Sequence, residues 1–240
     1  MRFMILEVDP VVLENGLVPF GQLISGRFEI PGQYATYTFE GQANQTIYFD
    51  ERGIEDDIIR SSSSQFSIFR PNGLLLTEIR GTPVNSADMG PLILPDDGLY
   101  TLVVDPIYDN TPAFQFFLWD VAEPLADERP IALGEPVTVE FMVPGQTAVY
   151  TFEVEAGQTF HLQEESYEEP ADLRRTRTNF TVTAPNGLPV AESYGTQVNR
   201  IRLGDMTAAE SGTYTLTIDP VYENTPIITF SLEEGPAGQE

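Results

Sequence analysis

One long pattern occurs twice along this chain. "PGQYATYTFE" at residues 31–40 returns as "PGQTAVYTFE" at residues 144–153, and "DPIYDNTP" at residues 105–112 returns as "DPVYENTP" at residues 219–226. Other shared segments keep the same order, and the offset between the copies stays at about 113 residues. Order and spacing held over such a length indicate a tandem duplication. We therefore expect the chain of 240 residues to contain two copies of one domain.

The alignment of the two copies sets the expected domain limits. The first repeat is predicted to span residues 9–121 and the second residues 122–234, followed by a polar tail at residues 235–240. Val121–Pro130, which contains two prolines, is predicted to be a short linker. Residues 1–8 stand apart, because they align with the last strand of the first repeat rather than with its beginning.

Short segments of alternating apolar and polar residues, divided by turn residues, fill both copies. Helical periodicity is weak throughout. This pattern predicts an all-β chain of two tandem antiparallel β-sandwich domains, jelly-roll-like in form. The predicted strands are Leu23–Ile30, Ala35–Glu40, Thr46–Phe49, Gln65–Arg70, Leu74–Ile79, Met89–Leu94, Tyr100–Asp105 and Ala113–Asp120 in the first copy, and Val137–Val143, Ala148–Val154, Thr159–Gln163, Asn179–Ala184, Pro189–Ser193, Val198–Leu203, Tyr214–Asp219 and Ile227–Leu232 in the second.

The doubled phrase "DPxYxNTP" is interpreted as a connection rather than a site. It lies between the "YTL" strand and the last strand of each copy. Proline after aspartate ends a strand, and Asn-Thr-Pro turns the chain. We expect a hairpin connection that was copied together with its domain.

Composition excludes several classes of partner. Hydrophobic residues make up 41% of the chain, enough for two cores, and the formal net charge is −25. All 12 basic residues are arginines. A negative field of this size repels nucleic acid, so nucleic-acid binding is not expected. Membrane insertion is not expected either, since no apolar run approaches the length of a membrane span.

Common catalytic sites lack their residues in this sequence. There is no cysteine, and His161 is the only histidine. No nucleophile elbow, phosphate-binding loop or zinc-ligand cluster occurs. His161 is expected to be a strand residue at a sheet face, and the chain is not expected to be an enzyme.

Acidic residues gather after the third predicted strand of each copy, in Asp50–Asp57 and in Glu164–Asp172. Hard cations such as Ca²⁺ prefer carboxylate oxygens from such segments, which makes Ca²⁺ a candidate ligand, although no cofactor is required for the expected function. Neither segment has EF-hand spacing, and acid-rich loops are also ordinary solvated surface. The candidate metal ligands are Asp50, Asp56, Asp57, Glu165, Glu169 and Asp172.

Two features suggest contacts with other molecules. Residues 1–8 form either a strand that pairs within their own domain or a strand that adds to the edge of a neighbouring subunit, in which case Phe3, Ile5 and Val8 are the contact residues. Trp119 could belong to a sugar-binding platform, but its place in the apolar "FQFFLWD" favours packing in the core or between domains.

Each repeat resembles the bacterial pre-peptidase C-terminal (PPC) domain family. The resemblance rests on "TYTFEGQANQTIYF" and "VYTFEVEAGQTFHL", the two "PNG" turns, and "GLYTLVVD" and "GTYTLTID". It covers nearly all of both copies and implies a small β-sandwich of a secreted or surface protein. The first copy departs from the family's Ala-Gly-Gln turn with "QANQT". The resemblance implies no catalytic residue.

The expected function is therefore non-enzymatic. We expect a structural or adhesive tandem β-sandwich module of a bacterial cell-surface protein or extracellular fibre, assembling by strand addition with copies of itself or of a parent surface protein. The alternative is an accessory carbohydrate- or protein-binding module of a secreted hydrolase, dependent on calcium. An extracellular or cell-surface location is expected, although the first residues are too short and too acidic for a signal peptide.

Overall fold

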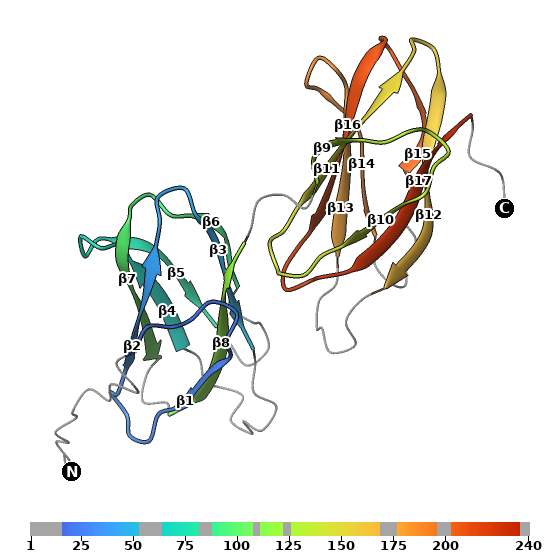
Figure 1. The fold of residues 1–240 in the computed structure, drawn as a ribbon. Coiled ribbons are helices and arrows are strands. Elements are labelled where there is room, and N and C mark those ends of the chain that lie inside the picture. The colour runs from blue at the N-terminus through green and yellow to red at the C-terminus, as the bar shows by residue number, and fades with distance from the viewer. Residues whose placement is uncertain are drawn as a thin grey trace. The chain divides into compact units, whose positions relative to one another are not determined.

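The chain forms two compact units, Met1–Asp120 and Val121–Glu240, called unit 1 and unit 2 below. Figure 1 shows them in a computed structural model. Within the described residues every regular element is a β-strand, and no helix is long and apolar enough to cross a membrane. The structure describes residues 16–52, 64–81, 88–107, 111–121, 126–168, 177–195 and 203–235.

Unit 1 contains eight described strands in two four-stranded sheets. One sheet has the order β1-β8-β3-β6, and the other has the order β2-β7-β4-β5. All described strand pairs in both sheets are antiparallel. The strands are β1 (Ile24–Arg27), β2 (Ala35–Gly41), β3 (Thr46–Glu51), β4 (Ser64–Phe69), β5 (Leu75–Arg80), β6 (Met89–Ile93), β7 (Gly98–Pro106) and β8 (Ala113–Asp120).

Unit 2 repeats this arrangement and adds one strand. Its sheets have the orders β10-β17-β12-β15 and β14-β13-β16-β11-β9. The strands are β9 (Ala126–Pro130), β10 (Val137–Glu140), β11 (Ala148–Val154), β12 (Thr159–Glu168), β13 (Thr178–Thr183), β14 (Pro189–Gly195), β15 (Leu203–Thr207), β16 (Gly212–Pro220) and β17 (Ile227–Glu234).

The strand order of both units is that of a jelly roll. In unit 1, strands 1, 8, 3 and 6 form one sheet and strands 2, 7, 4 and 5 the other, so the chain passes repeatedly from one sheet to the other. Eight strands arranged as two Greek keys in two facing sheets define this architecture. The predicted all-β fold of two tandem jelly-roll-like sandwiches is confirmed.

Alternation along the strands builds the two cores. In β2, Ala35, Tyr37 and Phe39 are buried and the residues between them are more exposed, as expected for a strand with one face toward the core. Aromatic rings fill the space between the sheets, with ring centroids of Phe49 and Phe66 only 4.9 Å apart. Each such ring removes about 150–250 Å² from water, which makes these contacts the main source of stability.

The repeated "PGQ" has a structural task in both units. The Gln33 Oε1 atom accepts the backbone N–H groups of Glu29 at 2.8 Å and Ile30 at 3.1 Å. Gln146 makes the equivalent pair of hydrogen bonds in unit 2, at 2.7 and 2.9 Å. The glutamine thus satisfies two backbone donors where the chain bends between sheets.

The "QANQT" departure in the first copy preserves the same turn. Asn44 adopts a positive φ of 67° where Gly157 adopts 84°. Asparagine is among the few other residues that tolerate this conformation. The glutamines that follow, Gln45 and Gln158, each accept a backbone N–H three residues earlier.

Three expectations need correction. Within the predicted linker Val121–Pro130, the residues Ala126–Pro130 form β9, which pairs in parallel with β11 and so covers the free edge of that sheet. Its sequence "ADERP" lacks the alternation that predicts strands. The "DPxYxNTP" segments are not hairpins, because each joins strands of different sheets, such as β7 and β8.

The third correction concerns the predicted strand Val198–Leu203. The observed strand β15 begins at Leu203 and ends at Thr207, and residues 198–202 lie outside the described residues. Leu203 and Met206 are the buried residues of β15 and fix its register against the core. The other predicted strands overlap observed ones, and Ala113–Asp120 and Ala148–Val154 match β8 and β11 at both ends.

Candidate functional site

The outward face of β8 in unit 1 carries two aromatic side chains. Phe114, Phe116 and Leu118 point inward and are buried in the core. Phe117 and Trp119 lie on the opposite, outward face, because side chains alternate along a strand, and both are only partly buried. Trp119 therefore does not pack in the core of unit 1, contrary to one of the two expectations for it.

These two rings stack on each other and on an arginine. The ring centroids of Phe117 and Trp119 are 4.8 Å apart with an interplanar angle of 16°. The Arg52 guanidinium carbon lies 5.5 Å from the centroid of the Phe117 ring. The backbone N–H of Arg52 bonds to the carbonyl of Gln115, two residues before Phe117. Phe117 thus lies against both an aromatic ring and a guanidinium group.

Asp50, on the neighbouring strand β3, accepts hydrogen bonds from two members of this stack. Its Oδ2 atom accepts a hydrogen bond from Arg52 Nε at 3.0 Å and another from Trp119 Nε1 at 3.2 Å. The Asp50 side chain is only 1% exposed, whereas that of Arg52 is 30% exposed. A buried carboxylate is costly without such donors. We name Asp50, Arg52, Phe117 and Trp119 the aromatic cluster.

Unit 2 has polar side chains at the equivalent positions, of which Ser231 is buried and Glu233 is partly exposed. The strand pairing of β17 with β12 places Ser231 and Glu233 where β8 has Phe117 and Trp119. Gln163 stands opposite Ser231, as Asp50 stands opposite Phe117. The two sheets have the same strand order, so the difference lies in the side chains alone.

His161 lies on this polar face of unit 2. It is a residue of strand β12, as expected, and is largely buried. Its Nδ1 atom lies 3.0 Å from the backbone oxygen of Gly235. The imidazole therefore has a backbone partner of its own.

The predicted metal ligands divide into two groups. Asp50 and Glu165 are described, and both lie within strands rather than in loops, since β3 ends at Glu51 and β12 at Glu168. Asp50 is buried with two N–H donors on one oxygen, and Glu165 is exposed. Asp56, Asp57, Glu169 and Asp172 lie outside the described residues.

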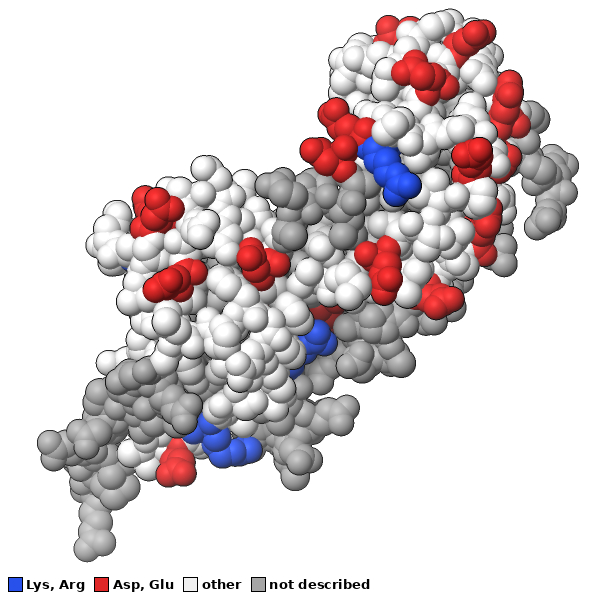
Figure 2. Space-filling model, in the orientation of Figure 1, with Lys and Arg blue, Asp and Glu red and all other residues white. Residues whose placement is uncertain are grey.

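The structure brings no cation site together in the part of the chain that it describes. Those residues contain no group of three or more histidine, cysteine, aspartate or glutamate side chains that could hold a metal ion. On the face shown in Figure 2, acidic side chains are scattered over both units. Calcium binding by the acidic segments stays a prediction. The predicted contact residues Phe3, Ile5 and Val8 also lie outside the described residues.

The aromatic cluster was not predicted from the sequence, although a signal was present. The strand "AFQFFLWD" is apolar at positions that face both sides of the sheet, whereas its copy "IITFSLEE" has serine and glutamate on the outward side. A sandwich strand needs only one apolar face. The extra pair Phe117 and Trp119 therefore marks a surface that the fold alone does not explain.

The fold defines both units as jelly-roll β-sandwiches, and comparison with known proteins adds no family. No family model matches the sequence, and no curated protein matches it. Solved structures with a similar chain path include tripeptidyl peptidase 2, with 11% identity, a TM-score of 0.29 and coverage of 96% of this chain. This chain spans only 24% of that peptidase chain.

Two further solved structures illustrate the range of similar chain paths. The M60 catalytic domain with two CBM51 domains from Clostridium perfringens ZmpB has 9% identity and a TM-score of 0.30, covering 95% of this chain and 38% of that one. The CUB1-EGF-CUB2 segment of human MASP-1/3 has 7% identity and a TM-score of 0.24, covering 88% and 99%. At such values these likenesses carry no argument about function.

Proposed function

We propose that this chain is a non-enzymatic module of a structural or adhesive kind that contacts a protein partner through the aromatic cluster of unit 1. One observation carries the proposal: unit 2 forms the same jelly roll with serine and glutamate in place of Phe117 and Trp119. The fold does not need the cluster. This surface requires a buried carboxylate, which is unfavourable, and the jelly roll of unit 2 forms without it. Binding to another molecule is the best explanation for such a surface.

The chemistry of the cluster favours a protein partner over a sugar. A sugar-binding platform offers an open ring face and polar groups that reach hydroxyls. Here the Phe117 ring is stacked on Trp119 and approached by the Arg52 guanidinium, and the Trp119 N–H is bound to a carboxylate that is itself 1% exposed. The backbone of Gly21 also lies beside the indole, since a Cβ atom there would be 3.6 Å from the ring.

The groups that remain accessible are those typical of protein interfaces. They are the partly buried rings of Phe117 and Trp119 and the part-exposed guanidinium of Arg52. Tryptophan, phenylalanine and arginine are enriched where proteins bind each other, and lysine is depleted there. Arg52 is also held in place by Asp50, so less side-chain entropy is lost on binding.

An extracellular or cell-surface location and a relationship to the PPC family belong to the same proposal. Its support is the strongly acidic surface without lysine, together with the shared turns. The "PGQ" glutamines hold equivalent bends in both units, and Asn72 and Asn186 of the "PNG" turns each accept an N–H two residues later. The "PNG" turns are among the motifs that carry the resemblance.

The test compares two variants at equivalent positions. Wild-type protein, Trp119→Ala and Glu233→Ala would be applied to an array of purified matrix proteins, collagen and fibrinogen among them, and to a glycan array. We expect saturable binding to one or more proteins, a loss of about tenfold or more in affinity for Trp119→Ala, and no change for Glu233→Ala.

Two results would overturn this function. Binding confined to glycans and lost in Trp119→Ala would identify a carbohydrate-binding module instead. Protein binding that Trp119→Ala and Glu233→Ala reduce equally would show that the aromatic cluster is not the contact surface.

A further inference from the structure

Strand β1 leaves one side of its backbone unpaired within the described sheet, because it stands at the end of the order β1-β8-β3-β6. Phe28, just after β1, donates its backbone N–H to the Pro112 carbonyl at 3.1 Å. Hydrogen-bonded pairs alternate along an antiparallel ladder. Ser25 and Arg27 therefore direct their backbone N–H and C=O groups away from β8, toward the free edge.

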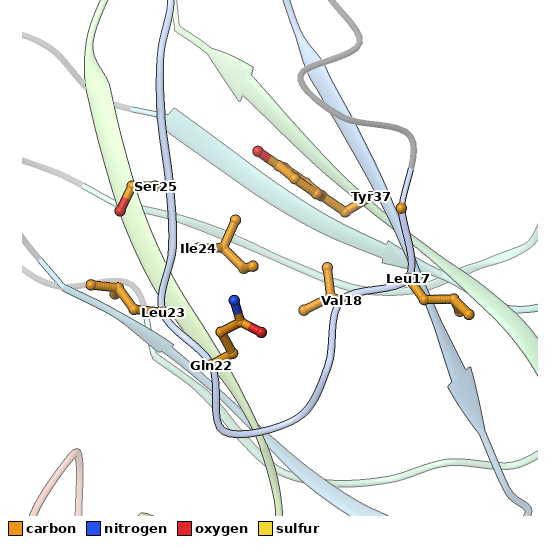
Figure 3. A pocket seen from close by; sticks show the side chains of 8 residues that line it. Leu17, Val18, Gln22, Leu23, Ile24, Ser25 and Tyr37 are labelled. Atoms are coloured by element: carbon orange, nitrogen blue, oxygen red, sulfur yellow. The ribbon is translucent and has the colours of Figure 1, made fainter.

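A pocket of about 440 Å³ opens beside this edge (Figure 3). The side chains of Val18 and Ile24 point toward each other from two walls, Gln22 presents its amide between them, and the Tyr37 ring closes another side. Val18 and Tyr37 are buried, so the floor of the pocket is already desolvated. This volume falls in the range of ligand pockets, of about 300–1,000 Å³, and has room for one large side chain.

A free strand edge next to a pocket whose walls include the apolar side chains of Val18 and Ile24 has the two parts that strand addition uses. The edge supplies main-chain hydrogen bonds to an extended segment, and the pocket selects one of its side chains. A small molecule would use the pocket alone and leave the edge unsatisfied. The arrangement therefore fits an extended peptide better than a compact ligand.

This chain contains a suitable segment. Residues Arg2–Val8 align with the last strand of the first repeat, which is β8, and β8 is the strand that pairs antiparallel with β1. Phe3 and Ile5 are apolar and two residues apart, so that in a strand they would point to the same side. Residues 1–15 lie outside the described part of the chain, and the proposal takes only their sequence.

Charge also distinguishes β1 from its counterpart β10. The free edge of β1 carries Arg27, whereas that of β10 carries Glu140. Every copy of this chain has a net charge of −25, and the Arg2–Val8 segment itself contains Glu7. An approaching copy is therefore repelled less at β1 than at β10.

We propose that the free edge of β1 accepts the segment Arg2–Val8 of a second copy by strand addition, with Phe3 or Ile5 in the pocket between Val18 and Ile24. This inference does not depend on the aromatic cluster. It specifies a self-association surface, with a short apolar strand as its partner.

The central experiment places a proline at the free edge. Ser25→Pro removes an N–H that points away from β8, so the ladder of unit 1 stays intact while an added strand loses a hydrogen bond. Thr138→Pro is the matched control, since Thr138 occupies the same place in β10. Sedimentation would measure self-association of the full chain, and calorimetry would measure binding of a synthetic peptide with the sequence of residues 1–10.

We expect self-association and peptide binding in the wild type, weakened about tenfold or more by Ser25→Pro and unchanged by Thr138→Pro. Gly16→Phe is the second variant, in case Ser25→Pro does not fold. Gly16 lines the pocket and a Cβ atom there meets nothing within 4 Å, so a ring can be added at the pocket's rim without a clash at Cβ. It should weaken both signals too.

The contrary outcomes are distinct from those of the proposed function. Equal effects of Ser25→Pro and Thr138→Pro, or a wild type that neither associates nor binds the peptide, would overturn the strand addition. One further result would show that the segment in the pocket does not come from a second copy. If the wild type is monomeric and only a Phe3→Asp, Ile5→Asp variant binds the peptide, then the pocket is filled by the segment of its own chain.

Discussion

The outward faces of two equivalent sheets differ sharply in chemistry. In unit 1, β8 and β3 present a stack of Arg52, Phe117 and Trp119 around a buried carboxylate. In unit 2, β17 and β12 present serine, glutamate and glutamine at the same register positions. The strand orders are identical, so the jelly roll tolerates either face.

This difference distinguishes residues that the fold requires from residues that are available for binding. What both units share are core aromatics, the bend-holding glutamines and the turn asparagines, each with a contact that explains it. What only one unit has cannot be required by the fold. In a duplicated chain, the second copy thus serves as the control for the first.

The largest effect is expected for Trp119→Ala. It removes a half-buried ring and leaves the buried Asp50 with one donor fewer, so unit 1 should lose about 2–3 kcal/mol of its free energy of unfolding. Glu233→Ala, at the equivalent position of unit 2, should change stability by less than about 0.5 kcal/mol. Amide hydrogen exchange of β8 and β17, followed by mass spectrometry, measures the two units separately. Equal effects would mean that the two side chains contribute equally to the stability of their units.

Unit 2 contains a polar network centred on Asn224. Its side-chain amide donates to Tyr167 Oη at 3.0 Å and, at 3.3 Å, to the backbone oxygen of Arg177 and to Thr178 Oγ1. Asn224 is fully buried, so Asn224→Ala should cost unit 2 about 2 kcal/mol. In unit 1, unfolding followed through Trp119, the single tryptophan, should not change. A shift of the tryptophan transition would show that the units do not unfold independently.

A shared tyrosine should matter in both units, with the larger effect in unit 1. Tyr100 Oη donates to the Asp96 carbonyl at 2.9 Å, and Tyr214 Oη donates to the Glu210 carbonyl at 3.0 Å. Tyr100 Oη also accepts the backbone N–H of Asp96 at 3.1 Å. Tyr214→Phe should cost unit 2 about 1 kcal/mol, because it leaves a carbonyl with one donor fewer, and Tyr100→Phe should cost unit 1 about 1–2 kcal/mol, because it also removes the acceptor of an N–H. Urea unfolding of both variants provides the measurement, and a larger loss for Tyr214→Phe than for Tyr100→Phe would contradict this order.

Most of the fold could be predicted because the same pattern of strands and turns occurs in both copies. Alternation along β2 and β11, and the turn chemistry of "PNG", point to the same sandwich in both copies. Strand β9 could not be predicted in this way, since its "ADERP" sequence pairs through backbone alone and carries no apolar pattern. The sequence did not predict that "DPxYxNTP" connects strands of two different sheets, because a turn sequence does not specify which sheet the next strand joins.

The candidate site was harder to predict, because its contacts join two strands. Asp50 was predicted as a metal ligand from the acidic segment around it, but the register places it opposite Phe117, within reach of Trp119 and Arg52. Sequence spacing cannot show such a cross-strand neighbour. The comparison of "FFLWD" with "FSLEE" would have shown that the outward face of β8 is exceptional.

The smallest predicted effect tests the first residue of the doubled "DPxYxNTP" phrase. Burial raises the pKa of the Asp219 carboxyl above its ordinary range, and a hydrogen bond with Asn179 opposes that shift in part. Because the folded-state pKa is raised, unit 2 should lose stability as pH rises from the ordinary carboxyl pKa of about 3.9 through the raised value, and the cost persists at neutral pH. Asp219→Asn should therefore stabilise unit 2 at pH 7, by less than about 1 kcal/mol because the group is partly solvated.

The matched control for this change is Asp105→Asn in unit 1, where the equivalent side chain is exposed. Urea unfolding at pH 4 and pH 7, with amide exchange to assign each transition, should show a smaller pH dependence only for the unit that carries Asp219→Asn. If Asp219→Asn lowers stability at pH 7, the carboxylate makes a favourable contact that outweighs its burial.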